Sequence, residues 1–256
     1  MNIDDRMAFA VSIAGKLAQY QLSFQLDSMN LERKSDDSPV TVADKESERM
    51  FRQAVKEAFP EDDILGEEEG GGEGGKPRWV IDPIDGTRKF MRNLPFWGIC
   101  IAFEVESEVE LGVVAVPGSG KMWTAQKGKG AWCAGQRITV DQSELSLDRA
   151  ILTMPPRKCF TAEKSEAYFD NLQERIEHDP GFLDAYSYSM IADGRVHGLL
   201  SCADRWWDIA APVCIVKEAG GCFTDLKNGP PAEGKLNLAA CPSIHEKLLD
   251  WAKYLA

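Results

Sequence analysis

The stretch WVIDPIDGT, residues 79–87, combines an apolar run typical of a buried strand with two carboxylates and a hydroxyl. Asp82 and Asp85 lie at the predicted strand end, so hard oxygen ligands gather there. Proline stiffens the backbone after Asp82, which lets the Ile84 carbonyl be aimed at a cation between the two carboxylates. A glycine then permits a sharp turn that brings the Thr87 hydroxyl to the same place. The stretch predicts a cation site.

A second acidic run supports this interpretation. Glu67, Glu68 and Glu69 follow a short apolar strand step, Ile64-Leu65, just before the first stretch. Residues 82–87 alone could form a simple loop, because Asp-Pro and Asp-Gly are common turn dipeptides. Four or five carboxylates at adjacent strand ends would repel each other without cations, however. The two runs together therefore predict bound divalent metal.

The overall charge points the same way. The 256 residues carry 29 basic and 41 acidic side chains and a formal net charge of −12. This excess would repel a nucleic-acid backbone, and it would also repel a small phosphate ester unless metal ions were bound. No apolar run reaches the roughly 20 residues needed to cross a bilayer, and the acidic start is unlike a signal peptide. We therefore predict a cytoplasmic protein that binds neither nucleic acid nor membrane.

The cysteines predict no further site. The chain has seven, an odd number without a CxxC pair, and this pattern suggests neither a disulfide framework nor a zinc site. We interpret them as small buried apolar side chains.

The periodicity divides the chain into two lobes. Residues 1–145 combine an amphipathic helix near 4–26, a second helix capped by Thr41, and several consecutive strands. The cap places Asp44 near the first turn of the second helix. Residues 146–256 alternate helix and strand. We therefore expect an α+β lobe followed by an α/β lobe.

Four elements resemble those of the inositol monophosphatase superfamily, and they occur in the order that this family has. They are Pro39-Val40-Thr41 with Asp44, Gly66-Glu67-Glu68, residues 79–87 with Phe90, and Trp207-Asp208-Ile209-Ala210-Ala211 with Glu218-Ala219-Gly220-Gly221. The resemblance extends over nearly the whole chain. It implies an α+β fold, the layered αβαβα sandwich of the inositol monophosphatase and fructose-1,6-bisphosphatase type, with the active site between the lobes.

The resemblance also implies roles for individual residues. Thr87 and Asp44 match the pair that orients and deprotonates the attacking water, and Glu68 matches a supporting residue beside the metals. Two or three Mg²⁺ ions, with lithium sensitivity at the weakest position, would assist hydrolysis of a phosphate monoester without a phosphoenzyme. The implied metal ligands are Glu67, Asp82, the Ile84 carbonyl, Asp85 and Asp208.

The resemblance implies that the substrate is a small phosphorylated metabolite, and we favour histidinol phosphate narrowly over inositol monophosphate. Arg88-Lys89-Phe90 departs from the Thr-Asn-Phe common in inositol phosphatases, and residues 184–188 resemble the histidinol-phosphatase form, although Leu183 replaces its usual glycine. An ammonium group on the substrate would call for an acidic partner. The residues proposed to contact substrate are Gly86, Thr87, Asp184, Asp204 and Ser201, where Ser201 replaces a customary carboxylate.

Other hypotheses stay open. A nucleotide 3′-phosphate or another small phosphate is a further candidate substrate, and a homodimer is a candidate assembly. A different class is an inactive paralogue that acts as a binding protein, but the intact acidic set of residues disfavours it.

Overall fold

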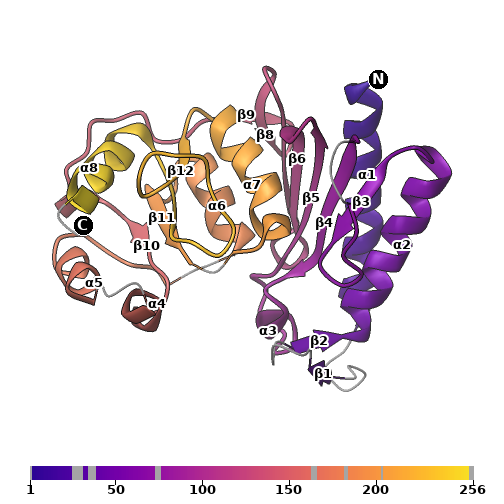
Figure 1. Cartoon of the computed structure of the whole chain (residues 1–256), viewed down its shortest axis with the longest axis horizontal. Helices are drawn as coiled ribbons and strands as arrows, with labels where there is room; N and C mark the ends of the chain where they lie inside the picture. Colours follow the sequence, from indigo (N-terminus) through magenta and orange to yellow (C-terminus); the bar gives the residue numbers. More distant parts are fainter. Residues whose placement is uncertain are drawn as a thin grey trace.

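The computed structural model describes residues 2–24, 31–33, 39–72, 76–162, 166–181, 184–202 and 204–253. Its layers follow one another along the longest axis (Figure 1). They are helices α1 (Ile3–Leu22) and α2 (Val42–Ala58), a seven-stranded sheet, helices α6 (Ala185–Ala192) and α7 (Trp206–Glu218), a four-stranded sheet, and helices α4 (Arg157–Ala162), α5 (Glu166–Gln173) and α8 (Pro242–Ala252). The predicted αβαβα sandwich is confirmed.

The larger sheet has its strands in chain order. They are β3 (Asp63–Gly66), β4 (Arg78–Asp85), β5 (Gly98–Val105), β6 (Glu108–Val116), β7 (Lys121–Gln126), β8 (Gly130–Cys133) and β9 (Gln136–Ile138). Strands β3 and β4 are parallel and the other neighbours are antiparallel. The parallel pair brings the carboxyl ends of β3 and β4 to the same edge of the sheet.

The smaller sheet has the order β10 (Leu152–Thr153), β11 (Gly198–Ser201), β13 (Asn237–Ala240) and β12 (Cys222–Asp225). Only β10 and β11 are parallel within it. A separate antiparallel pair, β1 (Leu31–Arg33) and β2 (Pro39–Thr41), precedes α2. The short helix α3 (Thr87–Phe90) follows β4 directly.

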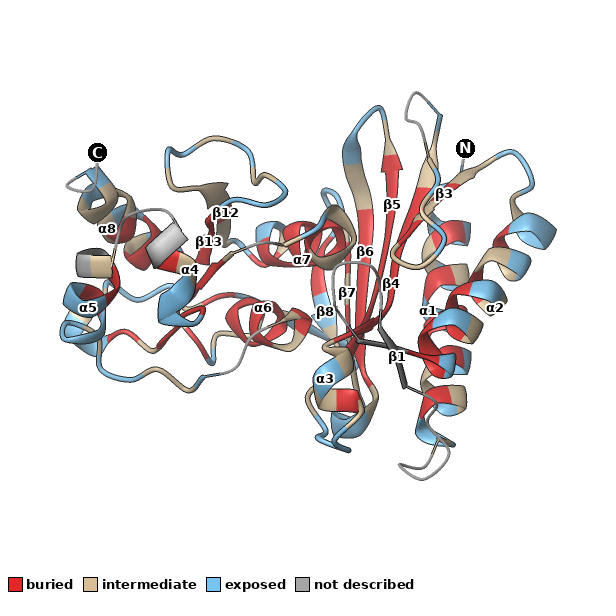
Figure 2. Cartoon of the chain, turned by 60° about the horizontal axis from the view of Figure 1, so that its bottom comes forward, coloured by how far each residue is buried: buried red, intermediate tan, exposed pale blue. Residues whose placement is uncertain are grey.

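The central strands β4 and β5 and the second half of β6 are buried on both faces, which explains why these segments are mostly apolar (Figure 2). Val80 and Cys100 belong to the core shared with α6, α7 and the smaller sheet. Trp79, Ile81 and Ile99 belong to the core under α1 and α2. Successive side chains of these strands thus belong alternately to the two cores. The acidic residues of β4 lie on the face that packs against α7.

Several local predictions are confirmed. Thr41 is the N-cap of α2, and its side chain and that of Asp44 form a reciprocal capping box. The first helix ends at Leu22, earlier than the predicted 26. The elements that were not predicted are strands β1, β2, β7, β8 and β13 and helices α3 and α4. The lobe boundary at residue 145 stays a prediction.

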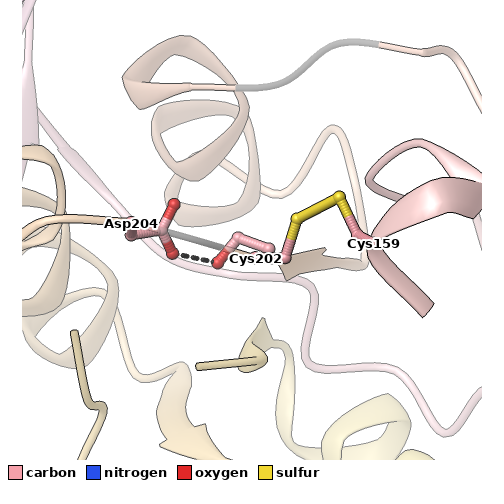
Figure 3. The surroundings of a disulfide bond; sticks show 4 residues. Cys159, Cys202 and Asp204 are labelled. Carbon is pink, nitrogen blue, oxygen red and sulfur yellow. Dashed lines mark hydrogen bonds between the residues drawn. A yellow bond between two sulfur atoms is a disulfide. The ribbon is translucent and has the colours of Figure 1, made fainter. Parts of the chain in front are cut away.

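The interpretation of all cysteines as free apolar side chains was wrong for one pair. Cys159 in α4 and Cys202 after β11 form a disulfide, with Cα atoms 6.4 Å apart, next to Asp204 (Figure 3). The two cysteines are 43 residues apart, so their meeting depends on the packing of α4 against the end of β11. Cys100, Cys214 and Cys241 are buried and free, as predicted.

Candidate active site

A β-bulge in β4 places two carboxylates on the same face of the sheet. Asp82 pairs with Cys100 of β5, whereas Asp85 pairs with Gly98, so three steps along β4 match two along β5. Residues three apart in a regular strand point to opposite faces, but the extra residue of the bulge restores the same side. Asp82 and Asp85 therefore both lie on the face covered by α6 and α7. Their side chains are buried, at 2% and 8% exposure.

Glu67 joins them from the neighbouring strand end. Gly66 of β3 pairs with Ile81, and the Glu67 amide donates a hydrogen bond of 3.3 Å to the Ile81 carbonyl. The Glu67 side chain is near enough to Asp82 for a side-chain hydrogen bond that raises the pKa of Asp82. The parallel pairing of β3 and β4 thus unites the two acidic runs that the sequence separates by a glycine-rich segment.

A buried carboxylate from α2 fixes the turn at residues 67–69, which follows β3. Glu48 is fully buried and accepts hydrogen bonds from the amides of Glu68 (2.7 Å) and Glu69 (3.0 Å). Arg52 forms an ion pair with Glu48 at 2.7 Å and donates to the Gly70 carbonyl at 2.6 Å. The backbone around Glu67 and Glu68 is therefore held by side chains that sequence reasoning did not identify.

Asp208 reaches the same region from the start of α7. It is the third residue of the helix, and its Oδ2 accepts a hydrogen bond of 2.7 Å from the Arg205 amide. This cap orients the carboxylate at the positive end of the helix. Burial nevertheless raises the pKa of Asp208 to about 8, with smaller contributions from the charges of Asp204, Glu67 and Asp184.

The acidic side chains form one cluster, because their charges raise one another's pKa. Burial is the main reason why the pKa of Asp82 is well above its ordinary value, followed by the charges of Glu67, Asp85 and Asp208. Burial also raises the pKa of Asp85, followed by Asp184 and Asp208. Such a set of buried carboxylates is stable as anions only with compensating positive charge.

The donor set fits magnesium, since carboxylate and carbonyl oxygens are the ligands that this ion prefers. Within the described ranges, no three acidic, histidine or cysteine side chains lie close enough together to hold a metal ion as they stand. Repulsion among carboxylates whose charges are not neutralised opposes their closer approach. The residues that would hold the ions are the predicted ones, Glu67, Asp82, the Ile84 carbonyl, Asp85 and Asp208.

A hydroxyl and a carboxylate meet beside this cluster. Thr87 Oγ1, in the first turn of α3, lies 3.3 Å from Asp44 Oδ1 and 3.3 Å from the Ile84 carbonyl. Asp44 Oδ2 also accepts from the Thr41 amide at 2.9 Å and from the Thr41 hydroxyl. Asp44 is fully buried, and burial raises its pKa to about 6 despite these hydrogen bonds from Thr41. The predicted pair of Thr87 and Asp44 is thus in contact.

Helix α1 supports the bulge from the opposite face of the sheet. The Gln21 amide nitrogen donates to the Pro83 carbonyl at 2.8 Å and to the Ser47 hydroxyl at 3.0 Å. Gln21 is 1% exposed, so these hydrogen bonds are shielded from water. A polar residue in an apolar helical face is a signal that could have identified this support from the sequence.

Asp184 lines the cluster from the α6 side. Its backbone has a φ of 74° and a ψ of −172°, a region almost restricted to glycine. The next amide, that of Ala185, donates a hydrogen bond to Asp85 Oδ2. A Cβ added at Gly86, where φ is 91°, would lie 3.0 Å from Asp184 Oδ2, so glycine allows this close approach. Lys89 of α3 forms an ion pair with Asp184 at 2.6 Å.

The other two proposed substrate residues are engaged in internal hydrogen bonds. Asp204 Oδ2 accepts from the Ser201 hydroxyl, from Asn237 at 3.2 Å and from Tyr188 at 3.4 Å. The single Tyr188 hydroxyl proton is shared with Ser201 Oγ, which lies 2.8 Å away. This buried network ties β11, β13 and α6 together behind the site. Substrate contacts from Ser201 and Asp204 stay a prediction, and the structural role of Asn237 and Tyr188 was not anticipated.

Known proteins share this fold and sequence pattern. The model of the inositol monophosphatase family matches residues 4–253. A histidinol-phosphatase of Chlorobaculum parvum is 34% identical over 86% of this chain and 86% of its own length, and human inositol monophosphatase 1 is 33% identical over 88% and 84%. The structure of a Thermotoga maritima IMPase is 30% identical, with a TM-score of 0.87 over 98% of both chains.

The layered fold and the buried acidic cluster are those of a metal-dependent phosphatase. The chain belongs to the inositol monophosphatase family. Within its described residues, no helix is long and apolar enough to span a membrane.

Proposed function

We propose that the protein hydrolyses a small phosphate monoester by direct attack of water, with Mg²⁺ held by Glu67, Asp82, Asp85, Asp208 and the Ile84 carbonyl. The observation that carries this proposal is the mutual electrostatic interaction of the buried carboxylates, which the β4 bulge and the start of α7 bring to one face. Two or three bound Mg²⁺ ions would neutralise this charge, polarise the phosphate and acidify a water molecule.

The chain's own residues then position and deprotonate the water. Asp44 accepts a hydrogen bond from Thr87, which leaves the lone pairs of the Thr87 hydroxyl free to accept from a water molecule. The raised pKa of Asp44, about 6, suits a group that must gain a proton near neutral pH. Glu68 has a supporting role beside the metal ions, and the hydrogen bond from its amide to Glu48 fixes its position in the turn.

The test is release of phosphate from small esters with and without Mg²⁺. Asp85→Asn should abolish turnover at saturating Mg²⁺, because it removes a charged ligand at the centre of the cluster. Asp250→Asn on the exposed surface of α8 makes the same chemical change and should keep full activity. Turnover by Asp85→Asn like that of the unmodified protein would exclude the metal-ligand assignment.

Histidinol phosphate is the substrate that we propose first, and inositol monophosphate or a nucleotide 3′-phosphate is the alternative. A relative named histidinol-phosphatase and one named inositol monophosphatase 1 are about equally similar to this chain. Asp184 is the candidate partner of a substrate amine, because its side chain is 30% exposed and its ion pair with Lys89 at 2.6 Å shows that a primary ammonium fits there. Asp204 is less suitable, since three side chains already donate to its Oδ2.

The substrate proposal is tested by comparing histidinol phosphate, inositol 1-phosphate and a nucleoside 3′-monophosphate by kcat/KM. Asp184→Asn should raise the KM for histidinol phosphate more than it lowers kcat, because the lost ion pair forms with the bound substrate. A preference for inositol 1-phosphate in the unmodified protein would refute the first choice and leave the phosphatase assignment intact. Lithium inhibition and a homodimer stay predictions.

A further inference from the structure

The ion pair between Lys89 and Asp184 connects two segments that the sequence does not relate. Lys89 lies in α3, immediately after the metal-binding stretch, and Asp184 lies at the start of α6. Lys89 Nζ is 2.6 Å from Asp184 Oδ2. The two segments therefore meet beside the acidic cluster, and this pair of charges bridges them.

The pair borders the reacting region closely enough to affect it. The charge of Asp184 raises the pKa of Asp85, and that of Lys89 lowers it. Asp184 also lies over Gly86, where an added Cβ would contact its carboxylate. A substrate group bound beside the metals would therefore meet Asp184 and Lys89 as its nearest charged neighbours from these two helices.

The pair is exposed enough to exchange partners. Side-chain exposure is 24% for Lys89 and 30% for Asp184. Ion pairs at such partly solvated positions are individually weak, and the four-carbon stem of lysine is flexible. The Lys89 ammonium can therefore leave Asp184 when another cation competes for the carboxylate.

We propose that Lys89 is a specificity-determining residue, whose ammonium occupies the position at Asp184 that the ammonium of an amine-bearing phosphate ester would take. Such a substrate must displace Lys89, so its apparent affinity is reduced by the fraction of molecules in which Asp184 is already paired. A substrate with only hydroxyl groups leaves the ion pair in place. The inference rests on the proposed role of Asp184 as the partner of a substrate amine.

The test compares Lys89→Met with Lys89→Arg, which keeps the positive charge. The measured quantity is the ratio of KM for histidinol phosphate to KM for inositol 1-phosphate. Lys89→Met should lower this ratio about two- to fivefold, the effect of losing an ion pair of this kind. Lys89→Arg should not lower it. The control is Lys247→Met on α8, which removes a surface ion pair with Glu144. It should leave the ratio and the activity unchanged.

A second measurement does not depend on the choice of substrate. With p-nitrophenyl phosphate as the reporter, the inhibition constant of histidinol, the amine without phosphate, should fall in Lys89→Met by a similar factor. An unchanged or higher constant would overturn the inference, as would a KM that rises for both esters, since Lys89 would then bind the phosphate. Failure of the unmodified protein to hydrolyse histidinol phosphate, with p-nitrophenyl phosphate still hydrolysed, would instead refute the substrate proposal.

Discussion

Thr87 and Asp44 are 43 residues apart in the chain, yet the Thr87 hydroxyl lies 3.3 Å from an Asp44 carboxylate oxygen. Asp44 is placed by the capping box at the start of α2, and Thr87 by the turn between β4 and α3. Each residue is thus positioned by a local backbone feature. Their contact depends on α2 lying beside the end of β4.

This contact predicts one shared relay. Thr87→Ala and Asp44→Asn should each lower kcat by about 10² to 10⁴-fold with little change in KM, the usual contribution of positioned acid-base groups. The double variant should be no slower than the slower single variant. Steady-state kinetics with saturating Mg²⁺ measure this. Thr139→Ala, at an exposed position, is the control, and fully multiplicative losses would argue against a shared relay.

The raised pKa values predict how stability depends on pH without metal. The pKa values of Asp44 and Asp208 are raised from 3.8 to about 6 and about 8, so the folded protein binds more protons than the unfolded chain in this range. The protonated carboxyl groups of Asp44 and Asp208 contribute to folding stability. This contribution is fully present below pH 3.8 and is lost as the pH rises through about 6 for Asp44 and about 8 for Asp208. For Asp44 alone the change is on the order of 3 kcal/mol.

The Tm of chelator-treated protein should therefore fall between about pH 5 and about pH 8.5, and added Mg²⁺ should raise Tm more at the higher pH. Thermal unfolding followed by circular dichroism at several pH values measures both effects. Asp208→Asn should flatten the decline near pH 8. Equal stabilisation by Mg²⁺ at both pH values would contradict the prediction.

The position of the Glu48 carboxylate leads us to predict that the turn at residues 67–69 requires glycine at position 66. A methyl group at Gly66 would overlap the Glu48 carboxylate, which holds the amides of Glu68 and Glu69. Gly66→Ala should therefore weaken Mg²⁺ activation and cost about 1–3 kcal/mol of stability, since buried hydrogen bonds must break. Gly15→Ala is the matched control. It lies within α1 with open space around its Cβ position, and should stabilise the protein by about 0.5–1 kcal/mol. Equal effects of the two substitutions would refute this role of Glu48.

The disulfide predicts the number of reactive thiols. Cys159 and Cys202 are joined and five cysteines are free, so the denatured protein should show five thiols without reductant and all seven after reduction. Cys202→Ser leaves Cys159 unpaired, so this variant should show the five free thiols and that of Cys159 both without reductant and after reduction. Titration with a chromogenic thiol reagent gives the count. Seven thiols in unreduced, denatured protein would contradict the pairing.

The sequence predicted much of the site because its chemistry is local. Asp82, Asp85 and Thr87 belong to one continuous stretch, and the cap at Thr41 fixes Asp44 within three residues. Helix and strand periodicity also predicted most elements of the sandwich. It did not predict β1, β2, β7, β8, β13, α3 or α4, which are short or lack a strong apolar pattern.

The sequence by itself determined most helices and strands and which acidic residues lie at their ends, because apolar periodicity and capping depend on neighbouring residues; the layered fold followed from the resemblance of its motifs to a known family. Only the tertiary structure decided which of these residues meet. The bulge in β4 turned Asp82 and Asp85 to one face, and packing brought Lys89 to Asp184 and Cys159 to Cys202. Such long-range contacts depend on how whole elements pack, and no local pattern records that geometry.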